Sequence, residues 1–230
     1  MKTIHILDHI ATPEPDAMRT HLAARGAQVD VVRMDLGDAA PVLGPDTGGL
    51  VITGGMQMVT DRGALPWMAA EFALIAQARA LGVPVLGICL GAQMIAHSLG
   101  GAVGPHPDGK VALGWYEVKA TEDGRDLFPP RLMTLSGNEQ GFTIPPGAEA
   151  LAMGDPFPCQ AFRHGPGTLA LQFHPEVTRA ILDDWQAMLK GNLAKPGAQS
   201  EAAQDAGMAA HDAALKTWLH ATLDRHFALV

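Results

Sequence analysis

The stretch VPVLGICLGAQ, residues 83–93, joins an apolar run to a cysteine with glycine two residues away on either side. A continuous apolar run of this kind is typical of a central strand in a parallel sheet, because such a strand is buried on both faces. The residues after Cys89 suit a helix that ends near Gly100 and Gly101. Cys89 is therefore predicted to lie at the carboxyl end of a buried strand, on the turn into a helix.

Strand and helix patterns alternate along the chain before this stretch. In chain order, β-rich and helix-compatible runs occur at residues 3–7, 14–25, 29–33, 50–53 and 66–81. This alternation predicts an α/β fold, in which helices cover a parallel sheet. After the helix that follows Cys89, the pattern changes to closely spaced strands, at residues 112–120, 132–135, 159–163 and 168–173.

The C-terminal part of the 230-residue chain separates from this pattern. A helix is expected over residues 177–190, and the segment 191–200, which contains KPGAQS, interrupts it. Residues 201–229 again suit a helix. We therefore expect one domain, residues 1–190, and a helical tail, residues 191–230, packed on the domain or on a partner. A mobile lid is the alternative role for the tail.

Composition excludes several classes of protein. Acidic residues outnumber basic ones, 24 to 16, for a formal net charge of −8, and no block of Lys or Arg could neutralise a run of phosphates, so nucleic acid is not an expected partner. The opening MKTIHILDHI does not resemble a secretory signal, and no apolar run approaches the roughly 20 residues of a membrane span. Two cysteines make no disulfide framework, so we expect a cytoplasmic protein.

Cys89 has the surroundings of a reactive thiol. Gly87 and Gly91 would allow a strained strand-to-helix turn that projects the side chain out of the sheet, as in a nucleophile elbow. The N-terminus of a helix also favours the thiolate. Taken alone, this pattern fits a buried core cysteine equally well.

A second motif, QFHPE at residues 172–176, ends a later apolar strand. Residues two apart on a strand point the same way, so His174 and Glu176 can emerge together. A carboxylate beside an imidazole fixes its tautomer and stabilises the imidazolium that forms when it takes a proton from a thiol. The two motifs together indicate a cysteine nucleophile with a histidine base.

The chain resembles the class I glutamine amidotransferases of the triad type, especially stand-alone proteins similar to the amidotransferase domain of GMP synthase. The resemblance runs from about residue 45 to about 180 and rests on motifs in a specific order, namely TGGMQMVTD (53–61), PVLGICLGAQMIAHSLGG (84–101), LGW (113–115), IPPGAEALA (144–152) and LQFHPEVT (171–178). It implies a flavodoxin-like or Rossmann-like three-layer sandwich with a mostly parallel central sheet.

The resemblance also implies roles for individual residues. Cys89 would be the nucleophile, His174 the base and Glu176 the residue that orients the base. The backbone N–H groups of Gly55 and Leu90 would form the oxyanion hole. Substrate-binding positions would be Gln93 and Ser136, and neither a metal nor a cofactor is expected.

Two departures from the family bear on the substrate. Met56 follows the paired glycines where many relatives carry Pro, and Ser136 to Glu139 lack the His that relatives often have there. Both disfavour free glutamine. The expected function is cysteine-dependent hydrolysis of a γ-glutamyl amide, either glutamine or a γ-glutamyl amine or peptide, through a γ-glutamyl thioester that releases ammonia or an amine.

Two alternatives stay open. No SGGVDS loop of a synthetase occurs in the sequence, so an ammonia-donating glutaminase would need a separate synthetase as its partner. A non-catalytic regulatory or binding homologue is the other reading. A homodimer is a further option for either class.

Overall fold

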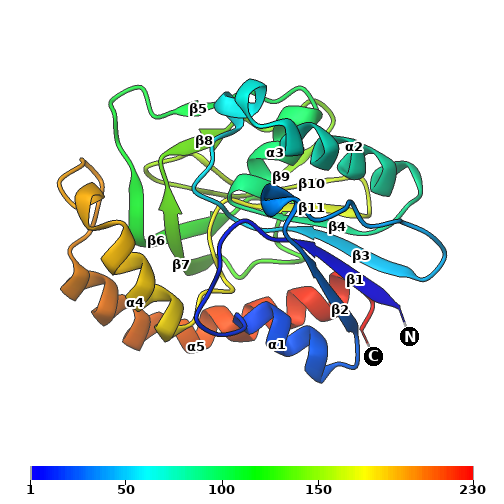
Figure 1. Cartoon of the computed structure of the whole chain (residues 1–230). Helices are drawn as coiled ribbons and strands as arrows, with labels where there is room; N and C mark the ends of the chain where they lie inside the picture. Colours follow the sequence, from blue (N-terminus) through cyan, green and yellow to red (C-terminus); the bar gives the residue numbers. More distant parts are fainter. Residues whose placement is uncertain (1, 230) are drawn as a thin grey trace.

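A nine-stranded sheet forms the centre of the computed structural model, which describes residues 2–229 (Figure 1). Five strands run parallel in the order β2-β1-β3-β4-β11, and they are β2 (Gln28–Val32), β1 (Thr3–Leu7), β3 (Thr47–Ile52), β4 (Val85–Ile88) and β11 (Thr168–Leu171). Four antiparallel strands continue the sheet in the order β10-β9-β6-β7, and they are β10 (Cys159–His164), β9 (Glu149–Gly154), β6 (Ala112–Ala120) and β7 (Arg131–Asn138). A separate ribbon pairs β5 (Val103–Pro105) with β8 (Gln140–Phe142).

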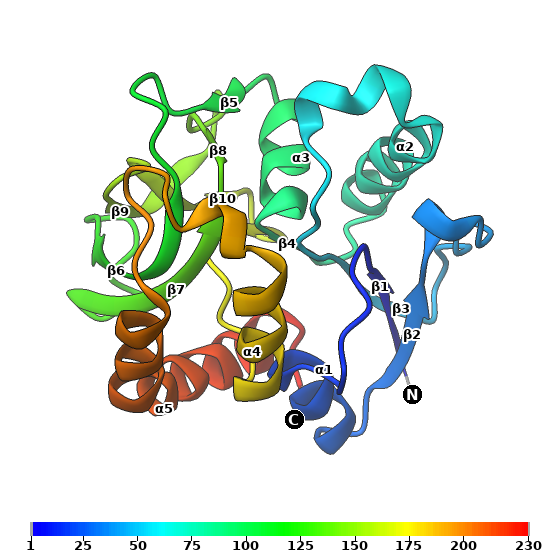
Figure 2. The ribbon, with the colours of Figure 1, turned by 60° about the vertical axis from the view of Figure 1, so that its left-hand side comes forward.

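Helices cover both faces of the sheet (Figures 1 and 2). On one face lie α2 (Pro66–Ala80) and α3 (Leu90–Ser98), and on the other α1 (Ala17–Ala24), α4 (Arg179–Met188) and α5 (Glu201–His226). Short 3-10 turns are η1 (Met34–Leu36), η2 (Val59–Ala64) and η3 (Lys190–Asn192). Each face has its own apolar core, one against α2 and α3 and the other against α1, α4 and α5. The predicted three-layer α/β sandwich is confirmed, with the parallel strands in its core.

The differences from the predicted elements have local causes. The helix expected from residue 14 begins only at Ala17, because Asp16 is its N-cap and accepts a hydrogen bond from the backbone N–H of Arg19 (2.7 Å). Strands β5 and β8 have three residues each and are too short to show an alternating pattern. The strand β9 follows directly on the proline- and glycine-containing turn of residues 145–147, which hides its beginning.

The C-terminal helix α5 belongs to the same core as the sheet. Its residues Leu215, Leu219 and Leu223 are fully buried, and the Trp218 indole N–H donates to the carbonyl oxygen of Leu127 (2.9 Å). The segment before it interrupts the helical pattern as expected, with η3 and turns between α4 and α5. The division at residue 190 stays a prediction. No helix within residues 2–229 is both long and apolar enough to cross a membrane, and the cytoplasmic location also stays a prediction.

The parallel strands bring four chain segments to one edge of the sheet. The carboxyl ends of β1, β3, β4 and β11 are neighbours, so the residues that follow them meet there. These are Asp8 and His9 after β1, Thr53 to Gly55 after β3, Cys89 after β4, and His174 and Glu176 after β11. Ligand sites of open α/β sheets lie at this edge.

The turn after β4 leaves no room for a side chain at Gly91. The Gly91 N–H donates to the carbonyl oxygen of Thr53 (3.3 Å), and a Cβ at Gly91 would overlap the carbonyl oxygen of Ile52. Although alanine is the better helix former, we expect Gly91→Ala to lower the free energy of unfolding by about 3 kcal/mol, because the backbone of β3 cannot move away. Chemical denaturation measures this. The matched control is Gly63→Ala, whose Cβ would meet nothing within 4 Å; equal effects of the two substitutions would contradict the explanation.

Candidate active site

Cys89 lies on a strained turn between β4 and α3. Its backbone has φ 49° and ψ −103°, a conformation that costs a non-glycine residue of the order of 1–3 kcal/mol and is found mainly at functional sites. Gly87 lets the strand and helix approach closely, since a Cβ there would lie 2.6 Å from the carbonyl carbon of Gly91. The side chain of Cys89 is 5% exposed. The sequence thus forms the strand–turn–helix geometry of a nucleophile elbow.

His174 and Glu176 emerge together from the segment after β11. The Nδ1–H of His174 donates to Oε1 of Glu176 (2.7 Å), and both residues are buried. The edge of the imidazole packs on Trp185, with ring centroids 4.6 Å apart. A Cβ added to Gly54 would lie 2.5 Å from Cε1 of His174 and 3.5 Å from Cβ of Cys89. The imidazole and the thiol therefore lie against the same glycine.

The electrostatics of this cluster favour an imidazolium. Burial lowers the pKa of His174, but the carboxylate of Glu176 and the negative charge of a Cys89 thiolate outweigh it and raise the pKa to about 10. With Nδ1 engaged by Glu176, Nε2 is the nitrogen left to exchange a proton with the thiol.

One pocket opens beside Cys89, and we call it the front pocket. It has a volume of about 600 Å³, is open to solvent, and is lined by residues 55–58, 89, 90, 93, 111–113, 137–140, 189 and 192. Gly55, Leu90 and Gln93 thus lie beside Cys89. Leu90 is the first residue of α3, so its N–H has no acceptor within the helix and is free for a ligand.

Ser136 lies elsewhere. It is 1% exposed on β7, opposite Gly114 of β6, and does not line the front pocket. The three residues after it do line the pocket. Among them, Glu139 is held by Nδ2 of Asn192 (2.9 Å) and Nζ of Lys195 (2.8 Å), both from the segment after α4.

Gln172 connects the thiol to the floor of the front pocket. Its Nε2 donates to Sγ of Cys89 (3.7 Å), and its Oε1 lies 3.4 Å from Nε2 of Gln93. Gln93 in turn donates to the carbonyl oxygen of Gln140 (2.8 Å). Asn138 and Gln140 each present a buried side-chain oxygen that has no partner within residues 2–229. The front pocket can therefore accept hydrogen bonds from an amide or ammonium group.

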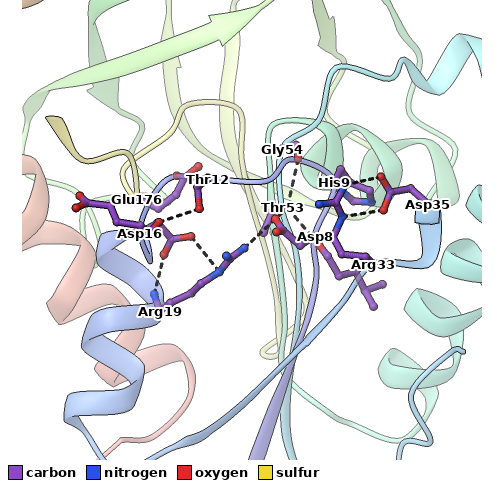
Figure 3. Close-up of polar contacts among 12 residues, drawn as sticks. Asp8, His9, Thr12, Asp16, Arg19, Arg33, Asp35, Thr53, Gly54 and Glu176 are labelled. Carbon is purple, nitrogen blue, oxygen red and sulfur yellow. Dashed lines mark hydrogen bonds and ion pairs between the residues drawn. The ribbon is translucent and has the colours of Figure 1, made fainter. Parts of the chain in front are cut away.

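A second pocket, the rear pocket, lies on the other side of His174. It has a volume of about 390 Å³, is also open to solvent, and is lined by residues 8, 10, 12, 16, 19, 53, 54, 174, 176, 177, 181 and 185. Figure 3 shows Arg19 reaching from α1 toward Asp8, with Nη2 to Oδ1 at 2.8 Å, while its Nε lies 3.3 Å from Oδ2 of Asp16. Thr53 also donates to Oδ1 of Asp8 (3.0 Å).

The rear pocket contains an unusually basic carboxylate. Burial raises the pKa of Asp16 to about 6; Arg19 opposes the shift, whereas the carboxylates of Glu176 and Asp8 add to it. No group of three or more His, Cys, Asp or Glu side chains in residues 2–229 is placed to hold a metal ion.

Comparison with known proteins identifies the family. A family model described as glutamine amidotransferase class-I matches residues 16–184. The chain belongs to this family. A subunit of the glutamine-hydrolyzing GMP synthase of Haloarcula marismortui is 34% identical to this class-I amidotransferase over 164 residues, which cover 69% of the chain and 80% of the relative. The match to the glutamine-hydrolyzing GMP synthase of a Synechocystis strain, 32% identical, covers 58% of the chain and about a quarter of that protein, 24%.

Solved structures agree with this assignment. A glutamine amido transferase from Methylobacillus flagellatus superposes with a TM-score of 0.88 at 27% identity, covering 100% of this chain and 94% of that one. A glutamine amidotransferase from Thermotoga maritima, with a TM-score of 0.86 at 24% identity and 98% of each chain covered, shows the same fold.

Some residues around this amidotransferase site were missed in the sequence. Gln172 could have been found, because it lies two residues before His174 and strand alternation puts both on one side. Asp8 follows a strand that ends at the same sheet edge, which is a weaker signal. Asp16 and Arg19 belong to the beginning of α1, and no local pattern places that helix end behind His174.

Proposed function

We propose that the protein hydrolyses a γ-glutamyl amide bond through a thioester on Cys89. The observation that carries the proposal is the cluster at the front pocket, where a strained elbow cysteine and a Glu-bound imidazole lie against the same glycine. Membership in the class-I glutamine amidotransferase family supports the γ-glutamyl class of substrate.

In the first half of the reaction, the thiolate of Cys89 attacks the γ-carbonyl carbon and the carbonyl oxygen becomes an oxyanion. The backbone N–H groups of Leu90 and Gly55 are the donors assigned to it, since both residues line the front pocket beside the thiol. Collapse of the tetrahedral intermediate breaks the C–N bond. His174 gives its Nε2 proton to the departing nitrogen, so the amine leaves neutral.

In the second half, water attacks the thioester while His174 takes one of its protons. The C–S bond breaks, the thiolate of Cys89 is restored, and the acyl group leaves as the γ-carboxyl group of glutamate. Glu176 keeps the imidazole oriented through the Nδ1 bond in both halves. Gln93 and Gln172 support the thiol side of the site, and Ser136 acts on the substrate only through the neighbouring residues 137–139.

The substrate is expected to be a γ-glutamyl amine or peptide. We expect at least one γ-glutamyl amine to be hydrolysed with a kcat/KM about tenfold or more above that of glutamine, because the Glu139 carboxylate is already bound by Lys195 and Asn192. Release of glutamate from a panel of γ-glutamyl amines and dipeptides, with glutamine alongside and no other protein present, measures this. Inactivity toward the whole panel would contradict a stand-alone hydrolase.

An ammonia-donating glutaminase is the second candidate. The observation in its favour is the Haloarcula relative, a GMP synthase subunit that this chain matches over 80% of its length. Such a protein would pass ammonia to a separate synthetase, and it would be active on glutamine in preference to γ-glutamyl amines. A non-catalytic role is disfavoured because Cys89, His174 and Glu176 are all present and close together. A homodimer stays a proposal.

A further inference from the structure

The rear pocket lies on the side of the site where the leaving group departs. His174 must contact the departing nitrogen, since it donates the proton to it, and so it marks the position of the leaving group. Cys89 lines the front pocket, whereas His174 lines the rear pocket. The peptide of Gly54 and Gly55 separates the two, with Gly55 on the front and Gly54 on the rear. The acyl part of a substrate in the front pocket would therefore direct its amine toward the rear pocket.

The rear pocket carries an excess of negative charge. Its lining contains three carboxylates, Asp8, Asp16 and Glu176, and two cations, Arg19 and the imidazolium of His174, which leaves one carboxylate uncompensated. Neighbouring charges do not remove the excess. Arg33 is paired with Asp35 (Nη2 to Oδ2 2.8 Å), and His9 is paired with Glu71 (Nε2 to Oε2 3.0 Å).

A buried oxygen faces this pocket without a partner. Glu176, which is 7% exposed, uses Oε1 for His174, while its Oε2 has no hydrogen-bond partner within residues 2–229. An unpaired buried carboxylate oxygen is costly, and a cation that donates hydrogen bonds would compensate it. Figure 3 shows Glu176 and Asp16 on the same side of Arg19.

The remaining wall suits an alkyl chain. Val177, Ile181 and Trp185 line the pocket and are buried, and Ile10 and Thr12 border it from the loop before α1. The volume of about 390 Å³ far exceeds the roughly 30 Å³ that a molecule of the size of ammonia occupies in a liquid. Apolar walls and excess carboxylates together match an alkylamine with a further positive charge.

We propose that the rear pocket binds the leaving group of a γ-glutamylated alkyl diamine, with the distal ammonium held by Asp16, Asp8 and Oε2 of Glu176. The inference rests on the proposed function and specifies its substrate class. The amide nitrogen of such a substrate is uncharged, so the carboxylates act on the distal ammonium in the intact substrate. After cleavage the released nitrogen takes a proton from water, and the dication leaves.

Two matched substrates test the inference. γ-Glutamyl-1,4-diaminobutane and γ-glutamyl-1-aminobutane differ by one terminal ammonium group. We expect the wild-type chain to prefer the diamine derivative by about tenfold in kcat/KM at pH 7.5. Asp16→Asn, which keeps an N-cap residue for α1, is expected to bring that ratio close to one. Asp8→Asn is a second variant with the same expected direction, and Asp46→Asn, at an exposed position outside both pockets, is the control that keeps the ratio.

A binding measurement separates this inference from the proposed function. Calorimetry with 1,4-diaminobutane on the Cys89→Ala chain should show binding at least tenfold tighter than with 1-aminobutane, and Asp16→Asn in that background should remove the difference. Hydrolysis of both substrates with a ratio near one overturns the rear-pocket inference and leaves the hydrolase standing. Hydrolysis of neither substrate overturns the proposed function, and the calorimetry then decides separately whether the pocket binds the diamine.

Discussion

Cys89→Ala is expected to lower kcat for γ-glutamyl amide hydrolysis by about 10⁴-fold or more, because no other group of the front pocket can form the thioester. The elbow conformation at φ 49° places a single nucleophile beside the free N–H of Leu90. Alanine removes the nucleophile and keeps the turn. Steady-state glutamate release with the best substrate of the panel measures the loss.

The other cysteine provides the matched control. Cys159 lies on β10, lines neither the front nor the rear pocket, and burial raises the pKa of its thiol. Cys159→Ala should keep kcat within about twofold. Intact mass after incubation with a glutamine-derived electrophile should show one adduct on the wild-type chain and on Cys159→Ala, and none on Cys89→Ala. An adduct that survives in Cys89→Ala would exclude the thioester mechanism.

The parts of the site that follow strands could be predicted from the sequence. The apolar run before Cys89 and the one before His174 are both strands buried on both faces, and their ends meet because β4 and β11 are direct neighbours. Local patterns identify a buried strand and the turn after it, so the placement of Cys89, His174 and Glu176 at one sheet edge followed. Gly55 and Leu90 are adjacent to the same strand ends for the same reason.

The parts that depend on distant packing could not be predicted. Asp16 and Arg19 reach the site because α1 packs behind the His174 segment, where the N–H of Ala17 donates to the carbonyl oxygen of Glu176 (2.9 Å). Asn192 and Lys195 reach Glu139 only because the segment after α4 returns along β6. Ser136 illustrates the opposite limit: a motif position can be aligned correctly while strand alternation turns its side chain into the sheet.

The substitution Glu176→Gln is expected to lower kcat by about 10³-fold while the fold is retained. The amide is close in size to the carboxylate, but it cannot stabilise the imidazolium of His174 by charge. Burial already disfavours that imidazolium, and Glu176 is the largest of the influences that raise the pKa of His174 to about 10. Without it the pKa falls, and the thiol loses its proton acceptor. Steady-state kinetics from pH 6 to 10 measure the loss and its pH dependence.

The same substitution has a defined effect on stability as the pH changes. The pKa of His174 in the folded chain, about 10, lies above the ordinary 6.5, so folding favours the protonated imidazole. The resulting stabilisation is fully present below about pH 6.5 and is lost as the pH rises toward 10. The difference in free energy of unfolding between the wild-type chain and Glu176→Gln should therefore be largest near pH 6 and shrink toward pH 10. Glu122→Gln, at an exposed position, is the control, and a difference that grows with pH would show that Glu176 does not hold an imidazolium.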